Sequence, residues 1–190
     1  MDFLPGRMDL THIGYVGASF GGSVVVHALL KEPRISAGVA QDGKPYFFDE
    51  TLSGLERPLM YMQSATPYIP SSDAQLAQWG LTAATFKAAE QDHFARLMQL
   101  FARTNGPIYN VYIRGTNHVS FSDLYRIIAL PDSGLMDVRR AHRIINEYTV
   151  AFFNRYLVGT SERLVDGRTP SPYDEVVVSS RNVVDQDVTD

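Results

Sequence analysis

The sequence predicts one α/β domain built on a parallel sheet, and three observations agree on this. Short apolar segments alternate with amphipathic ones, in the order strand, helix, strand, loop, strand, helix, strand, helix. The 190 residues are about the length of one ordinary domain. A composition that is 45% hydrophobic and 11% aromatic is typical of a chain that buries a core.

The first half of the chain contains three expected strands and one expected helix. The strands are short apolar runs at residues 12–16, 35–40 and 59–63, the last introduced by Pro58. A glycine-rich turn at 17–22 leads into a helix at 23–31, which Pro33 ends. Two prolines indicate a loop at 66–72.

The second half contains two long helices around one strand. Residues 82–104 carry apolar side chains at helical spacing, and the sequence Asn105-Gly106-Pro107 stops that helix; the apolar positions are Phe86, Phe94, Leu97, Met98 and Phe101. Residues 108–113 form an expected strand, and polar residues 114–117 then lead to His118. Residues 136–157 form the last amphipathic helix, which Gly159 closes. Residues 176–178 fit an edge strand or a packed extended segment.

The charge distribution divides the chain into residues 1–160, expected to be the folded domain, and residues 161–190, expected to be a polar, acidic and solvated tail. From residue 166 onward, six acids face two bases, which equals the whole net charge of −4. An acidic balance with a pI near 5.7 gives no electrostatic reason to bind nucleic acid.

Several chemistries are excluded by what the sequence lacks. Without cysteine there are no disulfides, no thiolate catalysis and no cysteine-ligated zinc. The histidines are scattered and no His-Glu-x-x-His occurs, so no metal site is expected. No phosphate-binding P-loop or complete dinucleotide fingerprint is present, and no cofactor is expected.

Neither a membrane span nor a signal peptide is visible. The longest apolar stretches, near 24–30 and 144–157, are interrupted by polar side chains and are shorter than a span requires. The first residues lack a basic start and an apolar region. The chain as it stands is therefore expected in the cytoplasm, and outside the cell if a longer parent chain carries a signal.

Gly17-x-Ser19-x-Gly21 lies between an expected strand and an expected helix, which is the context of a nucleophile elbow. A serine at the top of such a turn needs a strained backbone, and side chains at positions 17 and 21 would clash. Its hydroxyl would stand at a helix N-terminus, where the Phe20 backbone N–H is the expected first oxyanion donor. Ser19 is therefore the candidate nucleophile.

A serine nucleophile needs a base, and His118 is the histidine that follows an expected strand. Loops after parallel strands meet at the carboxyl edge of a sheet, where Ser19 also lies. The other four histidines, His12, His27, His93 and His142, do not follow strands.

The acid that orients the base is expected to follow a strand as well. Asp42 ends the second strand, while the segment after the third strand, 63–66, contains no acid. Asp73 is a distant alternative, and Asp123 is expected to hold the loop of His118. The order Ser19, Asp42, His118 is that of α/β-hydrolases.

These segments together resemble platelet-activating-factor acetylhydrolase and its bacterial relatives, which are serine esterases of the α/β-hydrolase fold. The resemblance covers about residues 9–180 and is carried by Gly17-Ala18-Ser19-Phe20-Gly21-Gly22, Asp42 and the segment from Gly115 to Asp123. It implies Ser19 as nucleophile, His118 as base, Asp42 as acid and Phe20 N–H as oxyanion donor. It also implies a short-acyl or phospholipid-like ester as substrate.

The sequence departs from that family before residue 17, where the family has further strands, two helices and a loop with the second oxyanion donor. The expected fold is therefore the α/β-hydrolase fold without its N-terminal strands and helices. Strand 12–16 would become an apolar edge that invites pairing, for example in a homodimer. Loss of one oxyanion donor would lower the rate by about 10²–10³.

Two hypotheses follow. The first is a serine ester hydrolase, in which Tyr46, Phe47, Phe48 and Tyr68 either line an acyl pocket or, as we favour, fill the core. The second is a non-catalytic half-domain that persists as a dimer or with a partner that completes its sheet.

Overall fold

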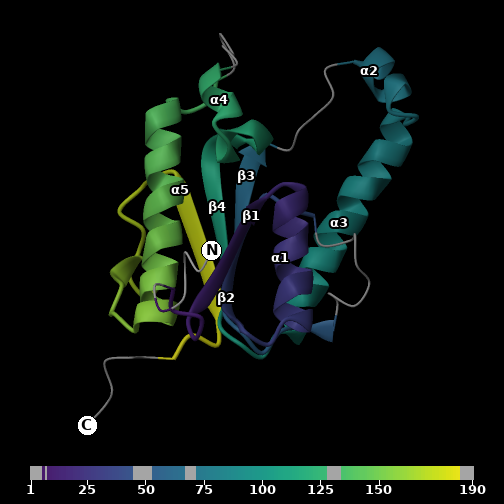
Figure 1. Ribbon diagram of the computed structural model, residues 1–190. Helices are drawn as coiled ribbons and strands as arrows, with labels where there is room; N and C mark the ends of the chain where they lie inside the picture. The colour runs from purple at the N-terminus through teal and green to yellow at the C-terminus, as the bar shows by residue number, and fades with distance from the viewer. Residues whose placement is uncertain (1–5, 7, 45–52, 67–71, 128–133, 185–190) are drawn as a thin grey trace.

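A five-stranded sheet forms the centre of the computed structural model, which describes residues 6, 8–44, 53–66, 72–127 and 134–184 (Figure 1). The strands are β1 (Ile13–Ala18), β2 (Ile35–Gln41), β3 (Leu59–Thr66), β4 (Ile108–Asn117) and β5 (Val176–Arg181). They lie in the order β1-β2-β3-β4-β5, with β1 to β4 parallel and β5 antiparallel to β4. The predicted parallel α/β architecture is confirmed, and β1 is an edge strand.

Helices cover both faces of the sheet. Between the strands run α1 (Phe20–Lys31), α2 (Asp73–Gln78), α3 (Ala83–Arg103), α4 (Leu124–Ile127) and α5 (Val138–Phe153). Short helical turns add η3 (His118–Phe121), η4 (Asn154–Val158) and η5 (Arg163–Val165). Figure 1 shows α5 on one side of the sheet and α1 with α3 on the other. The result is a three-layer α/β arrangement.

The long helices begin at side-chain caps that fix their starting points. The Thr82 hydroxyl accepts from Thr85 N–H at the start of α3. Asp137 accepts from the Arg139 and Arg140 N–H groups at the start of α5. These bonds satisfy donors that a helix leaves unpaired in its first turn. Beyond α5, Gly159 has φ 80°, a left-handed conformation that ends η4, the continuation of α5, as predicted.

The face under α5 is a continuous apolar core. The strand residues that point to it are Met60, Met62, Tyr109, Val111 and Ile113, and all are fully buried. From α5, Ile144, Tyr148 and Phe152 pack against them. Because alternate residues of a strand share a face, β3 and β4 present apolar side chains here along most of their length. This face therefore holds the larger part of the core.

On β3 and β4 the opposite face is apolar mainly toward the amino ends of the strands. Leu59 and Ile108 lie there with Leu97 and Leu100 of α3, and the same cluster includes Val25, Val26 and Leu29 of α1. We expected the buried stripe of α3 to include Phe94 and Met98, but Phe94 is 60% exposed and Met98 38%. Counted back from Leu100 in steps of three and four, the inward stripe is instead Leu97, His93, Glu90 and Phe86.

Strand β4 is longer than the sequence indicated. It continues to Asn117, which pairs with Thr66 of β3, because Gly115 takes a left-handed φ of 71° that redirects the strand without ending it. The strand thereby delivers the next residue, His118, directly to the carboxyl edge of the sheet.

The expected solvated tail is largely part of the fold, so the division at residue 160 does not appear in the structure. Val165 is fully buried, and Val176 lies in the core under α5. The segment 176–181 is the edge strand β5, one of the two forms expected for it. Its residues alternate between more and less buried positions, as in a strand with one face on the core. Residues 185–190 lie outside the described part.

No helix in the described part of the chain combines the length and apolar character needed to cross a membrane.

Candidate active site

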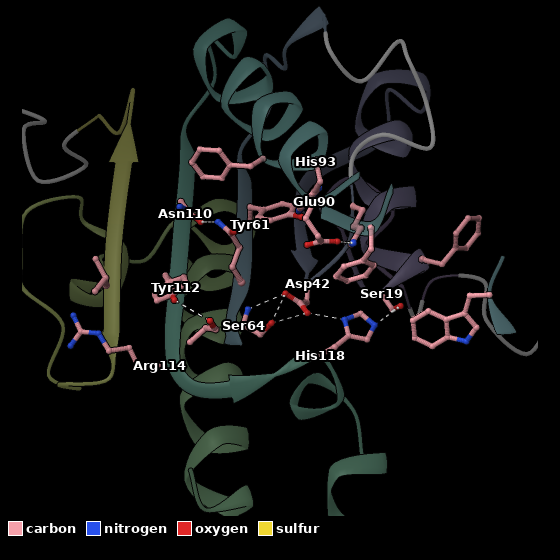
Figure 2. A pocket seen from close by; sticks show the side chains of 18 residues that line it. Ser19, Asp42, Tyr61, Ser64, Glu90, His93, Asn110, Tyr112, Arg114 and His118 are labelled. Atoms are coloured by element: carbon pink, nitrogen blue, oxygen red, sulfur yellow. Dashed lines mark hydrogen bonds and ion pairs between the residues drawn. The ribbon is translucent and has the colours of Figure 1, made fainter. Parts of the chain in front are cut away.

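Four polar residues from four neighbouring strands meet at the carboxyl edge of the sheet. Ser19 follows β1, Asp42 follows β2, Ser64 lies near the end of β3 and His118 follows β4. Figure 2 shows their side chains in one row. Parallel strands place their carboxyl ends at the same edge, which is why residues 99 positions apart can touch.

Ser19 occupies a tight turn between β1 and α1. Its backbone has φ 57° and ψ −123°, a strained conformation for a non-glycine residue. Its N–H donates to the Gln41 carbonyl at 2.9 Å, which ties the turn to the end of β2. A Cβ at Gly17 would lie 2.4 Å from the Gly21 carbonyl oxygen, so position 17 requires glycine. A Cβ at Gly21 would meet nothing within 4 Å, so the expected clash there is wrong.

A backbone-to-backbone contact holds the Asp42 turn against the Ser19 turn. A Cβ on Gly43 would lie 2.4 Å from the Ser23 nitrogen, and one on Gly22 would lie 3.0 Å from the Gly43 Cα. Neither position has room for a side chain. The two glycines therefore fix how closely the turns that carry Ser19 and Asp42 approach each other.

Ser19, His118 and Asp42 form one unbroken chain of hydrogen bonds. The Ser19 Oγ lies 2.8 Å from His118 Nε2, and His118 Nδ1 lies 2.7 Å from Asp42 Oδ2. Both distances are normal for hydrogen bonds. In this arrangement the Ser19 hydroxyl donates to Nε2 while the Nδ1–H donates to the carboxylate. The three residues selected from the sequence are thus brought together.

Ser64 holds Asp42 from the side opposite His118. Its N–H donates to Asp42 Oδ1 at 2.9 Å, and its hydroxyl lies 3.1 Å from each carboxylate oxygen. Asp42 itself has a left-handed φ of 49°, and its N–H donates to the Met62 carbonyl at 2.8 Å. Donors aimed at a carboxylate fix its orientation. No sequence motif marks Ser64.

His118 begins the turn η3, which a reciprocal cap stabilises. The Asn117 N–H donates to the Ser120 hydroxyl at 3.1 Å, and that hydroxyl donates to the Asn117 side chain at 3.2 Å. Ser120 and Phe121 are buried below the turn. The His118 imidazole is thus hydrogen-bonded through both ring nitrogens, and the turn that carries it packs on buried side chains.

The alternative acids do not take part in this chain of bonds. Asp73 is the exposed first residue of α2, and the Asp123 carbonyl accepts from Arg126 N–H at the start of α4. Of the other histidines, His12 pairs with Asp9 at the exposed start of β1. Only Asp42 has a carboxylate within hydrogen-bond distance of His118 among the described residues.

A cavity of about 680 Å³ adjoins Ser19 and His118. Its lining comes from the ends of β3 and β4, from α3 and from residues beside the two turns; it includes Phe20, Tyr61, Gln63, Trp79, Phe86, Phe94, Asn110, Tyr112 and Arg114. Volumes of this order hold drug-sized ligands. The expected lining residues Tyr46, Phe47, Phe48 and Tyr68 lie outside the described residues.

Charged and titratable side chains also line the cavity. Lys44, two residues after Asp42, forms an ion pair with Glu90 of α3. Burial, and secondly the Lys44 ammonium, lower the pKa of His93 below its ordinary value. His93 was not a candidate base because it does not follow a strand. The spacing of Phe86, Glu90 and His93 on one helix stripe could have placed all three at the same surface.

No group of three or more histidine, aspartate or glutamate side chains arranged to hold a metal occurs in the described ranges.

Comparison with known proteins places the chain in a family. Residues 1–165 match the family model for platelet-activating factor acetylhydrolase, isoform II. The chain is 25% identical to platelet-activating factor acetylhydrolase of Gallus gallus, over 95% of this chain and 39% of that protein. It is 24% identical to the acetylhydrolase of Cavia porcellus, over 81% of this chain and 32% of that protein. The chain thus spans less than half the length of these curated relatives.

Among solved structures, the chain is similar to a ferulic acid esterase from Streptomyces cinnamoneus. The TM-score is 0.69 with 22% identity, over 90% of this chain and 48% of that one. At this identity the likeness shows the fold, which is the α/β-hydrolase fold. Because the family model covers residues 1–165, the chain belongs to the family of platelet-activating factor acetylhydrolase, isoform II.

Proposed function

We propose that the chain is a carboxylic ester hydrolase with Ser19 as nucleophile, His118 as general base and Asp42 as the acid that orients it. The observation that carries the proposal is the continuous pair of hydrogen bonds, 2.8 Å and 2.7 Å long, that links the three side chains. Nucleophile, base and orienting group in this contact are the arrangement that serine hydrolysis requires.

In the first half-reaction the Ser19 Oγ attacks the ester carbonyl carbon while His118 Nε2 takes the hydroxyl proton. Asp42 stabilises the imidazolium through Nδ1–H and keeps the ring in the required tautomer. The Phe20 backbone N–H, at the first residue of α1, is the proposed donor to the oxyanion. The C–O bond to the alcohol then breaks, and His118 gives its proton to the leaving oxygen.

In the second half-reaction, water attacks the acyl-enzyme while His118 Nε2 again takes the proton. The C–O bond to Ser19 breaks, the serine regains its proton and the acid product leaves. We propose short-acyl or phospholipid-like esters as substrates, since the matching relatives are named acetylhydrolases. No cofactor enters either step.

The direct test uses p-nitrophenyl acetate and a fluorophosphonate probe on the folded chain. Wild type is expected to release p-nitrophenol and to take one label, while Ser19→Ala does neither. A folded wild-type chain that shows no turnover and no label contradicts the proposal. His118→Ala and Asp42→Asn test the other two roles, and each is expected to lower kcat by about 10⁴ with the fold retained. An unaffected rate in Asp42→Asn would move the acid role elsewhere.

Ser64 is proposed as the residue that positions Asp42. Ser64→Ala removes the hydroxyl but keeps the backbone N–H bond, so we expect kcat to fall about tenfold with KM little changed. Ser64→Thr retains the hydroxyl and should recover most of the rate. Equal rates in all three proteins would show that the hydroxyl does not act through Asp42.

A second candidate function is pairing through the free edge of the sheet. Strand β1 is an edge strand, and Val16 in its middle is 48% exposed. An apolar edge with unpaired backbone groups can add a strand from another chain, here a second copy. Size-exclusion chromatography with light scattering is expected to give a dimer that Val16→Lys dissociates. A stable monomer at all concentrations would contradict this candidate.

A further inference from the structure

The cavity lies where the sheet face under α3 changes from apolar to polar side chains along the strands. On β3 the residues of this face are Leu59, Tyr61 and Gln63, two positions apart. Leu59 is fully buried in the core under α3, whereas Gln63 is only half-buried and lines the cavity. The face therefore turns from apolar to polar toward the carboxyl edge.

Strand β4 repeats the change. Ile108 is fully buried in the same core, while Asn110 and Tyr112 of the same face line the cavity. Above them α3 inclines away from the sheet toward its N-terminal end (Figure 1). Its residues Phe86 and Glu90 line the cavity instead of packing on the strands. Polar residues and an open space thus coincide at one place.

The polar floor is an amide pair with spare hydrogen-bonding capacity. The Gln63 Nε2–H donates to Asn110 Oδ1, as Figure 2 marks beside the Asn110 label. Among the described residues, neither Gln63 Oε1 nor Asn110 Nδ2 has a protein hydrogen-bond partner. Gln63 Oε1, the second Gln63 N–H and both Asn110 N–H groups remain, so a single hydroxyl group can donate to Gln63 Oε1 and accept from an Asn110 N–H.

The lining of the cavity is rich in aromatic rings. Trp79, Phe86, Phe94, Tyr61 and Tyr112 all line the cavity. Aromatic side chains bind flat rings through stacked and edge-on contacts, beyond the gain from apolar burial. An acetyl group would leave most of a 680 Å³ space unfilled.

We infer that the cavity holds the acyl group of the ester, and that an acyl group with an aromatic ring on a short spacer and a hydroxyl at its far end is preferred over the short acyl groups that the names of the relatives suggest. This rests on the proposed function, because it places the carbonyl at Ser19. The acyl group is the part of the substrate present in both half-reactions. A preformed site for it therefore orients the ester carbonyl in the first step and the acyl-enzyme carbonyl in the second. The alcohol must lie at His118 Nε2 to receive its proton, and it leaves after the first step.

Tryptophan fluorescence tests the inference without catalysis, because Trp79 lines the cavity and the chain has one tryptophan. The titration uses the Ser19→Ala protein with methyl 3-(4-hydroxyphenyl)propanoate and with methyl 3-phenylpropanoate, which lacks the hydroxyl. Both are expected to change the emission of Trp79, with the hydroxylated ester binding about tenfold more tightly, the effect of one buried hydrogen-bonded group. Equal affinities, or no response to either ester, would overturn the inference.

Variants locate the selectivity. Asn110→Leu and Gln63→Met, each added to Ser19→Ala, replace the amides by apolar groups of similar size and should bring the affinity ratio close to one. Gln91→Met, on the exposed side of α3, is the matched control and should keep the ratio. A ratio that survives both amide variants overturns the inference, and a melting curve for each variant shows that it is folded.

Kinetics separate this inference from the proposed function. The p-nitrophenyl esters of the same two acids should give a tenfold ratio of kcat/KM in the Ser19 protein, and this ratio is independent of the fraction of active enzyme. Turnover of both esters with a ratio of one overturns the cavity inference and leaves the esterase intact. No turnover and no label at Ser19 overturns the esterase and with it the acyl role.

Discussion

The two faces of the sheet are covered to different extents. Under α5, strands β3 and β4 present five fully buried apolar residues, and the helix packs on them along the strands. Under α3, the same two strands present Leu59 and Ile108 at one end, and Gln63 and Asn110 beside a cavity at the other. One sheet thus supports a dense layer on one side and an open one on the other.

The comparison indicates that the face under α5 contributes most of the stability, whereas the face under α3 contains the cavity beside Ser19. Buried apolar side chains on the α5 face stabilise the strands, so that the other face can leave polar groups and open space near Ser19. The predictions below test this division, from the largest expected effect to the smallest.

Phe152→Ala should have the largest effect on stability. The ring is fully buried and contacts Tyr109 and Tyr156 with centroid distances of 5.8 Å and 4.9 Å. Removing it leaves a cavity in a packed layer and should lower the free energy of unfolding by about 3–5 kcal/mol. Urea denaturation measures this. A loss below about 1 kcal/mol would show that the α5 face is not the main stabilising layer.

Two substitutions on the same stripe of α3 should have different effects, one on stability and the other on substrate binding. Leu97→Ala empties a buried position and should destabilise the protein by about 2–5 kcal/mol. Phe86→Ala, three turns earlier and beside the cavity, should lower stability by about 1 kcal/mol or less. We expect Phe86→Ala instead to raise KM for esters with large acyl groups. Equal losses of stability in the two variants would contradict the proposed division along α3.

The smallest effect should be a pH dependence that comes from His93. Burial and the Lys44 ammonium lower its pKa in the folded protein, while Glu90, Asp42 and Asp92 oppose the shift. The unfolded chain therefore takes up a proton at higher pH than the folded one. This contribution to stability is complete above about pH 6.5, the ordinary value, and is lost as pH falls through the lower folded pKa.

His93→Gln isolates that contribution. Urea denaturation of both proteins at about pH 7.5 and about pH 5 should show a smaller decrease with acid in the variant than in wild type. If both proteins lose the same stability on acidification, His93 is not responsible.

Most of the sheet could be predicted from the sequence because its strands are short apolar runs next to turn residues. The starts of β2, β3 and β4 agree with the structure to the residue. The end of β4 could not be predicted, because a left-handed Gly115 continues a strand that polar residues suggested had finished. The C-terminal segment was misjudged because its charges masked an alternating pattern in β5.

The catalytic candidates could be predicted because each directly follows a strand. The parts of the site that depend on how elements pack together could not. Ser19, Asp42 and His118 were each selected by position after a strand, and the structure joins them by hydrogen bonds. Ser64 was passed over because the search after β3 was for an acid, whereas the residue there supports an acid on the neighbouring strand. The cavity could not be predicted, because it depends on the angle at which α3 leaves the sheet.

The contact between Gly22 and Gly43 has a practical consequence for anyone who wishes to alter this protein. At this contact the serine and aspartate turns meet through main-chain atoms, with no side chain between them. Libraries that keep the three reacting residues, together with Tyr61 and Ser64, which hydrogen-bond the aspartate turn, can therefore vary the rest of the cavity lining and change substrate preference without altering this contact. The same contact marks the two positions that such a library must leave untouched.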